Sequence, residues 1–224
     1  MHQLTPPLRH RPHRRRRQSG VTLIELLVTI TIFGIMLAVG IPNASRWLLA
    51  NRARGASEFY ADGFSLARRQ AVAHNAFSRI SLTPNGNTGQ MDWQVDICFV
   101  SQAAQCTDVQ GDWSTTDAPS AGDPEGAAGW KSVFRAASAL PPAEVLQPTT
   151  LPAGASQVYY TPLGWVDPRI AGRLTSLRLD PSAAFADDVQ PAALVVTLAG
   201  MATKCNPTLP DTCLLYTSPS PRDS

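Results

Sequence analysis

The pattern of apolar and polar positions begins with a polar, basic stretch, residues 1–18, which is followed by a long apolar run. The run extends for twenty-one residues from Val21 to Ile41 and contains one charge, Glu25. A helix of that length covers roughly 30 Å at ~1.5 Å per residue, the thickness of the hydrocarbon core of a bilayer. The run therefore predicts a membrane-spanning helix.

The helical pattern continues beyond the membrane to about residue 75, which gives one predicted helix over residues 21–75. Apolar residues recur there at steps of three and four, while most charges fall on the other face. Pro42 should bend this helix at the membrane exit, because proline removes a backbone hydrogen bond and clashes with the preceding turn. The predicted apolar stripe consists of Leu49, Ala53, Ala56, Tyr60, Phe64, Ala67 and Ala71.

Short segments separated by proline and glycine follow, and they predict a globular β domain over residues 76–212. Residues 101–130 are rich in Ser, Thr, Asp, Gly and Pro without periodicity, which predicts an exposed loop. A sheet that covers the stripe gives an α+β fold, a long helix packed on an antiparallel β-sheet. The predicted strands are 77–82, 93–100, 132–137, 157–161, 174–179 and 193–198.

Glu25 needs an explanation, because a carboxylate in a lipid-facing helix costs on the order of 2 to 3 kcal/mol. The basic leader ending in Gly20, followed by Val21-Thr-Leu-Ile-Glu25-Leu-Leu27, resembles the processing site of type IV pilins and type II secretion pseudopilins. The resemblance implies cleavage after Gly20 by a prepilin peptidase and methylation of the new N-terminal amine of Val21, where the family usually has phenylalanine. It also implies that Glu25 pairs with the terminal amine of a neighbouring subunit, and Pro42 matches a helix-kinking proline of many members.

Further segments resemble H-type pseudopilins and FimT-like minor pilins. These are residues 65–72 near the predicted helix end, Leu151-Pro-Ala-Gly154 and Tyr160-Thr-Pro-Leu-Gly164. The resemblance implies a minor structural subunit of a type II secretion pseudopilus or a type IV pilus, acting in protein secretion or pilus assembly. Its implied partners are other pseudopilins or minor pilins and an inner-membrane assembly platform. DNA binding in natural transformation, as in FimT-like proteins, is the alternative.

Two other interpretations of the apolar run stay open. A cleavable signal peptide has an apolar core of about 7 to 15 residues before a small-x-small site. The one such site here, residues 38–40, lies inside a longer run. A plain signal anchor would need neither Glu25 nor a glycine directly before the apolar run.

The charge distribution predicts orientation and argues against nucleic-acid binding. Six arginines lie in the leader, residues 1–20, without an acid, and the rest of the chain has 13 Lys and Arg against 17 Asp and Glu. Positive flanks stay in the cytoplasm, so we expect a single-pass protein of the inner membrane with its C-terminal domain in the periplasm. Binding to DNA depends on neutralising phosphates with Lys and Arg, and the mature chain is acidic.

The cysteines favour two local disulfides, although four cysteines allow three connectivities. Cys98 and Cys106 form one close pair, and Cys205 and Cys213 form the other. Neither spacing is that of a zinc knuckle, and His74 is the only histidine outside the leader. We therefore expect no metal site.

The sequence also indicates no enzyme and no cofactor. Nucleophilic catalysis needs an activated side chain beside a base, and with one histidine no His-based triad can form. Asp187 and Asp188 are interpreted as solvated turn residues, and no phosphate-binding glycine loop is present. An enzyme that uses carboxylates alone is the remaining alternative.

The last residues, 213–224, resemble the translation of a sequencing adapter read in frame. We expect this tail to be non-native, in which case Cys213 and the second disulfide would not belong to the natural protein.

Overall fold

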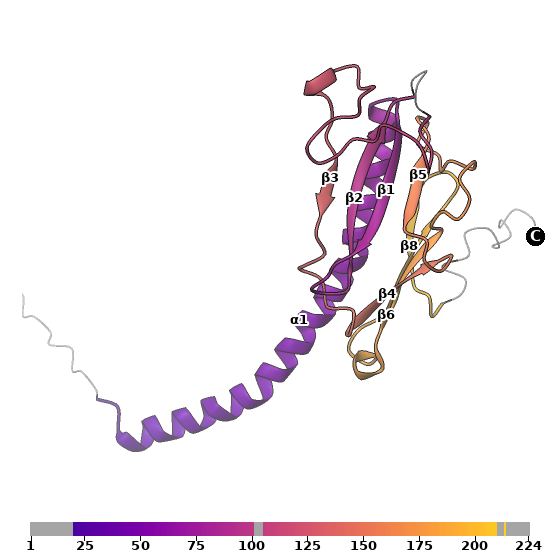
Figure 1. The fold of residues 1–224 in the computed structure, drawn as a ribbon. Helices are drawn as coiled ribbons and strands as arrows, with labels where there is room; N and C mark the ends of the chain where they lie inside the picture. The colour runs from indigo at the N-terminus through magenta and orange to yellow at the C-terminus, as the bar shows by residue number, and fades with distance from the viewer. Residues whose placement is uncertain (1–19, 101–104, 210–212, 214–224) are drawn as a thin grey trace, which may run out of the picture. The chain divides into compact units, whose positions relative to one another are not determined.

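The computed structural model describes residues 20–100, 105–209 and 213 (Figure 1). The chain divides into two compact units, one up to Ala44 and one from Ser45 onward. The leader up to residue 19 and the tail from residue 214 lie outside the described residues. The predictions made for them therefore stay predictions.

The helix α1 covers Leu23–Ala73, inside the predicted range of 21–75. It begins after Thr22, whose side-chain oxygen accepts a hydrogen bond from the backbone N–H of Glu25 at 3.3 Å. It ends where Asn75 adopts a positive φ of 48°, a left-handed conformation that asparagine tolerates better than most residues. Pro42 lies within α1, and the bend expected there stays a prediction.

The second unit contains two antiparallel four-stranded sheets, where a single sheet was predicted. One sheet has the order β3-β2-β1-β5 and the other the order β4-β6-β7-β8. The first consists of β1 (Phe77–Pro84), β2 (Met91–Cys98), β3 (Val133–Arg135) and β5 (Gln157–Tyr160). The second consists of β4 (Leu146–Leu151), β6 (Ser176–Pro181), β7 (Ala192–Val196) and β8 (Ala202–Cys205). Two short 3-10 helices cover Gly126–Ala128 and Ala183–Phe185.

Six of the eight strands match predicted segments, and β4 and β8 were missed. In β4 the sequence LQPTTL contains a proline and little apolar alternation, and β8 has only four residues. Both strands lie at sheet edges. Proline is tolerated at an edge, and edge strands need less apolar sequence, so the pattern that marks a central strand was absent.

The predicted stripe of α1 forms one side of the core. Its alanines and aromatic residues from Ala53 to Ala71 are buried, and only Leu49 of the predicted set is half-buried. The other side comes from both sheets, through side chains such as Ile80, Val95 and Leu177. Figure 1 shows β1 and β2 running along the second half of the helix. The expected α+β architecture, an N-terminal helix packed on antiparallel sheets, is confirmed.

A buried amide ties the helix to both sheets. Gln90, just before β2, accepts a hydrogen bond from the Tyr60 hydroxyl at 3.1 Å and donates to the carbonyls of Pro141 and Leu146. The Tyr60 hydroxyl in turn accepts from the backbone N–H of Met91 at 3.0 Å. Every polar atom of this cluster is satisfied only while α1, β2 and the start of β4 stay together.

Replacing Gln90 by alanine should lower the free energy of unfolding of the second unit by roughly 2 to 4 kcal/mol, since it leaves a hydroxyl and two carbonyls unpaired and creates a cavity. Thermal unfolding of the detergent-solubilised protein would measure the loss. The matched control is Gln147→Ala, because Gln147 is exposed on β4. Equal stability of the two variants would contradict this role of Gln90.

The predicted exposed loop over residues 101–130 is partly wrong. Residues 101–104 lie outside the described residues, but Ser114, Ser120 and Asp123 are buried. Ser114 accepts the backbone N–H of Ile97 at 2.9 Å, and the Asp123 carboxylate accepts the backbone N–H groups of Glu125 and Trp130. The polar composition of this segment predicted that its side chains are exposed to solvent. In the structure, these buried side chains form hydrogen bonds with backbone groups instead of with water.

The structure contains two disulfides, Cys98–Cys106 and Cys205–Cys213. These are the two local pairs that the spacing favours. The first links the end of β2 to the loop that follows it, and the second links the end of β8 to the tail. Whether Cys213 is native stays a prediction, since most of the tail lies outside the described residues.

Candidate processing and assembly site

The first unit exposes an almost continuous apolar surface. Its large apolar side chains, such as Leu23, Phe33 and Ile41, are 43 to 82% exposed. An eighteen-residue window of this part of α1 has a mean hydropathy of 2.4, and none of it is buried. Such a surface is unfavourable in water but fits the hydrocarbon core of a bilayer, where the helix satisfies its own backbone.

Gly20 and Val21 lie before the helix, in exposed chain without regular structure. A Cβ atom added at Gly20 would meet nothing within 4 Å, and the φ of this residue is not in the left-handed region. The fold itself therefore does not require glycine at position 20. A requirement for a small residue there would come from another molecule, as expected for a bond that an enzyme must reach.

Thr22 and Glu25 form the start of α1. Thr22 is the residue before the first helical residue, and its side chain caps the backbone N–H of Glu25. The pattern Thr-x-x-Glu is that of a capping box, and an acid in the first turn is favoured by the helix dipole. This capping role of Thr22 was not predicted from the sequence, although the three-residue spacing between Thr22 and Glu25 indicates it.

Glu25 is therefore placed at the helix start with its side chain exposed. Apolar neighbours such as Leu23, Ile24 and Leu26 are exposed around it. Once this surface enters lipid, water no longer solvates the carboxylate. An ionised acid in such a position needs a cation, and a terminal amine on Val21 of another subunit would supply one.

Two ionisable groups of the second unit with perturbed pKa values are Asp167 and Tyr160. Hydrogen bonds from Arg169 lower the pKa of the buried Asp167, which Arg169 contacts at 2.6 Å. Burial raises the pKa of Tyr160, whose hydroxyl has no hydrogen-bond partner within the described chain. Neither group lies beside a nucleophile and a base in a shared site.

Among the residues that the structure describes, no group of three or more His, Cys, Asp or Glu side chains could hold a metal ion. His74 lies just past the end of α1 and half-buried, with its ring centroid 6.1 Å from that of Trp130. Asp188 lies in a turn after the second 3-10 helix and contacts Arg46 at 3.8 Å, while Asp187 is exposed.

Comparison with known families finds a match to the prokaryotic N-terminal methylation motif, over residues 15–41. No curated protein matches the chain. No solved structure matches it either. The matched segment contains Gly20, Val21 and Glu25, and it ends at Ile41. The motif implies processing by a prepilin peptidase and assembly with other pilins, and together with the helix packed on antiparallel sheets it supports a membrane-anchored, type IV pilin-like protein.

Proposed function

We propose that this chain is a minor pseudopilin or minor pilin, a structural and non-enzymatic subunit. It is cut after Gly20, methylated on Val21, held in the inner membrane with its second unit in the periplasm, and recruited into a short filament by an assembly platform. The observation that carries the proposal is the single acid, Glu25, in the first turn of an otherwise apolar exposed helix. In a filament, bundled helices would give that acid a cationic partner away from lipid.

The arrangement of two resembling segments supports the H-type or FimT-like subfamily. Arg68, within residues 65–72, donates from Nε to the carbonyl of Gly164 at 3.1 Å. Gly164 ends the segment Tyr160-Thr-Pro-Leu-Gly164 and has a φ of 77°. A side chain at position 164 would come within 2.8 Å of Val72. The two segments that resemble this subfamily are distant in sequence, and they contact each other in the structure.

A surface for neighbouring subunits is available beside this contact. The turns at 161–165 and 197–201 lie side by side, joined by a hydrogen bond from the Val166 N–H to the Leu198 carbonyl at 3.0 Å. They carry four exposed large apolar side chains, which is an unusual concentration for a surface that meets only water. These side chains are Leu163, Trp165, Leu198 and Met201.

Deletion of the gene tests the proposal. We expect loss of type II secretion of exported proteins or loss of surface pili, with restoration by the full-length gene. The two readouts, exoprotein in the medium and pili by electron microscopy, also decide between the two systems. A deletion strain with both functions at wild-type level would contradict a role in either filament.

DNA binding is the alternative, and the structure gives a reason to disfavour it. FimT-like DNA binders carry a Gly-Arg-x-Arg motif where this chain has Gly200-Met-Ala-Thr-Lys204. Lys204, the one basic residue of that segment, forms an ion pair with Glu58 of α1. The one basic charge of that segment therefore has a carboxylate beside it, which would repel a phosphate.

We expect residues 46–212 to show no measurable DNA affinity at physiological salt, because the domain is acidic and phosphate contacts supply most non-specific affinity. A mobility-shift titration with duplex DNA at several salt concentrations would measure this. A shift that weakens steeply as salt rises would overturn the prediction.

A further inference from the structure

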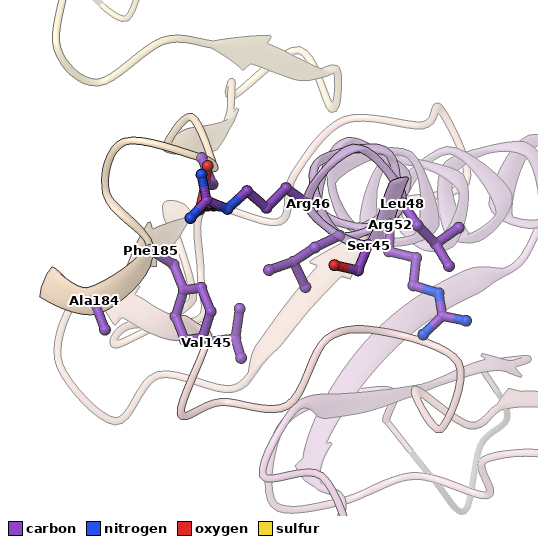
Figure 2. A pocket seen from close by; sticks show the side chains of 9 residues that line it. Ser45, Arg46, Leu48, Arg52, Val145, Ala184 and Phe185 are labelled. Carbon is purple, nitrogen blue, oxygen red and sulfur yellow. Dashed lines mark ion pairs between the residues drawn. The ribbon is translucent and has the colours of Figure 1, made fainter. Parts of the chain in front are cut away.

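A pocket of about 560 Å³ opens at the end of the second unit where its part of α1 begins. Leu49 of α1, together with Val145 and Phe185 across from it, supplies an apolar lining, and each of the three is half-buried. Figure 2 shows the Arg46 and Arg52 side chains pointing apart, so the two cations lie at different edges of this lining. Pockets of this size accept ligands larger than one side chain, so a short segment of another chain can enter.

The two arginines keep the capacity to meet further carboxylates. Arg46 contacts Asp188 at 3.8 Å, a long ion pair in which the arginine side chain is 67% exposed. The Arg52 side chain is exposed and makes no hydrogen bond or ion pair with any residue that the structure describes. Two arginines against one aspartate leave the pocket with a net positive charge. It therefore favours an apolar segment that is flanked by acids.

A turn of this composition lies after the first disulfide. Residues 107–110 form a turn that is closed by a hydrogen bond from the Thr107 N–H to the Gln110 carbonyl at 2.7 Å. Val109 in this turn is 83% exposed, more than any other large apolar side chain that the structure describes in the second unit. Asp108 and Asp112 flank it and are exposed, and neither carboxylate makes a hydrogen bond or ion pair within the described chain. The turn thus matches the pocket in both apolar character and charge.

The pocket and the turn lie at opposite ends of the second unit. The part of α1 from Ser45 to Ala73 covers about 42 Å, and β1 begins at Phe77, directly after the helix ends. Phe77 is paired with Cys98, the last residue of β2, and the disulfide from Cys98 to Cys106 holds the start of the turn there. One copy therefore cannot place its own turn in its own pocket.

Packing behind the turn fixes its position. The Trp113 ring lies against Arg79 of β1, whose guanidinium carbon is 4.5 Å from the ring centroid. Gly111 has a φ of 145°, and a Cβ atom there would come within 2.7 Å of Trp113. A turn that is already ordered loses little conformational freedom when it binds. Val109 is therefore presented in a fixed position.

We propose that the pocket of one copy binds the 107–110 turn of a second copy of this chain, head to tail. Val109 enters the apolar lining, and the two acids that flank it meet the two arginines at the edges. α1 rises about 9 Å between the two arginines, and the four residues from Asp108 to Asp112 span up to about 14 Å when extended.

The contact joins two different surfaces of the same chain. Such a contact forms a ring if the rotation between copies closes, and an open helical filament if it does not. The proposal rests on the proposed function as a filament subunit, and it adds the surfaces by which two copies meet.

Site-specific photocrosslinking between two full-length copies tests the contact. Both are expressed in the deletion strain: one carries a diazirine amino acid at position 109 and an epitope tag, and the other carries a different tag. We expect a crosslinked dimer with both tags, linked to a peptide that contains Leu49, Val145 or Phe185. The control places the same amino acid at Phe134, an exposed position of β3 outside the turn, and should give no such link.

The same strains separate failure of the contact from failure of the proposed function. Restored secretion or piliation without a crosslink from position 109 would overturn the contact and leave the filament role intact. A crosslink to a different protein alone would overturn the pairing of two copies. A crosslinked dimer in a strain whose deletion changes neither secretion nor piliation would support the contact and contradict the filament role.

Exchange of charges tests the complementarity of the two surfaces. Asp108→Arg/Asp112→Arg should lower the yield of crosslinked dimer at least about tenfold, because like charges then face each other. Adding Arg46→Asp/Arg52→Asp to the same chain reverses both surfaces and should restore most of the yield. Restoration also shows that the variant chains fold.

The matched control for the acidic pair is Asp117→Arg/Glu125→Arg. It makes the same change in charge at two exposed positions outside the turn and should crosslink like the wild type. Equal loss in this control, or no restoration in the fourfold variant, would overturn charge pairing between the turn and the pocket.

Discussion

Replacing Gly20 by valine is expected to leave the leader attached to a membrane-bound precursor. Position 20 has open space around it and lies outside the helix, so the larger side chain should not disturb the fold. A site shaped around glycine is overfilled by valine at a cost of roughly 1 to 3 kcal/mol, which corresponds to cleavage that is about 5 to 150 times slower. Immunoblotting should show a band larger by the twenty-residue leader.

Gly20→Ala is the control for this substitution, because it adds a single methyl group. We expect it to be processed, more slowly than the wild type at most. Cleavage of the valine variant at the wild-type rate would mean that no small residue is needed before Val21, and the prepilin interpretation of the leader would fail.

Replacing Glu25 by leucine should separate insertion from assembly. The variant should insert at least as well as the wild type, because it removes a charge that costs on the order of 2 to 3 kcal/mol in lipid. It should still be cut, since the scissile bond is unchanged. It should not enter filaments, because the terminal amine of the neighbouring subunit would be buried without a partner, at a cost of roughly 3 to 5 kcal/mol. Crosslinking to other pilins, with secretion or piliation assays, measures the loss.

A second variant distinguishes pairing from helix capping. Thr22→Ala removes the side chain that caps the Glu25 N–H, with an expected cost of about 1 kcal/mol to the helix start, but it keeps the carboxylate. We expect this variant to assemble. If the Thr22→Ala variant is as defective in filament assembly as the Glu25→Leu variant, the role of Glu25 is to stabilise the start of α1 and not to pair with a neighbouring amine. If Glu25→Leu assembles like the wild type, Glu25 is not an assembly contact.

The sequence predicted the helix and most strands well, because those elements repeat a period over many residues. The stripe from Ala53 to Ala71 is buried as the three- and four-residue spacing indicates. The division of the strands into two sheets was not predictable in the same way. Alternation marks a strand, but pairing partners such as β4 and β6 depend on contacts distant in sequence.

Part of the candidate site could also be predicted from sequence alone. Gly20, Val21 and Glu25 lie within six consecutive residues, so the motif that they form can be recognised in the sequence without knowledge of the fold. The partner of Lys204 could not be predicted, because Glu58 is 146 residues away and one surface carboxylate resembles another. The pocket between Arg46 and Phe185 could not be predicted for the same reason, since these residues meet only after β6 and its following turn fold back onto α1.

The mass and sequence of the N-terminal peptide of the membrane-extracted protein test the central claim most directly. Tandem mass spectrometry should find a chain that begins at Val21 with one methyl group on its amine, followed by Thr22 and Leu23. A chain that keeps residues 1–20, or one that begins after residue 40, would contradict processing as a prepilin and with it the proposed role in a filament.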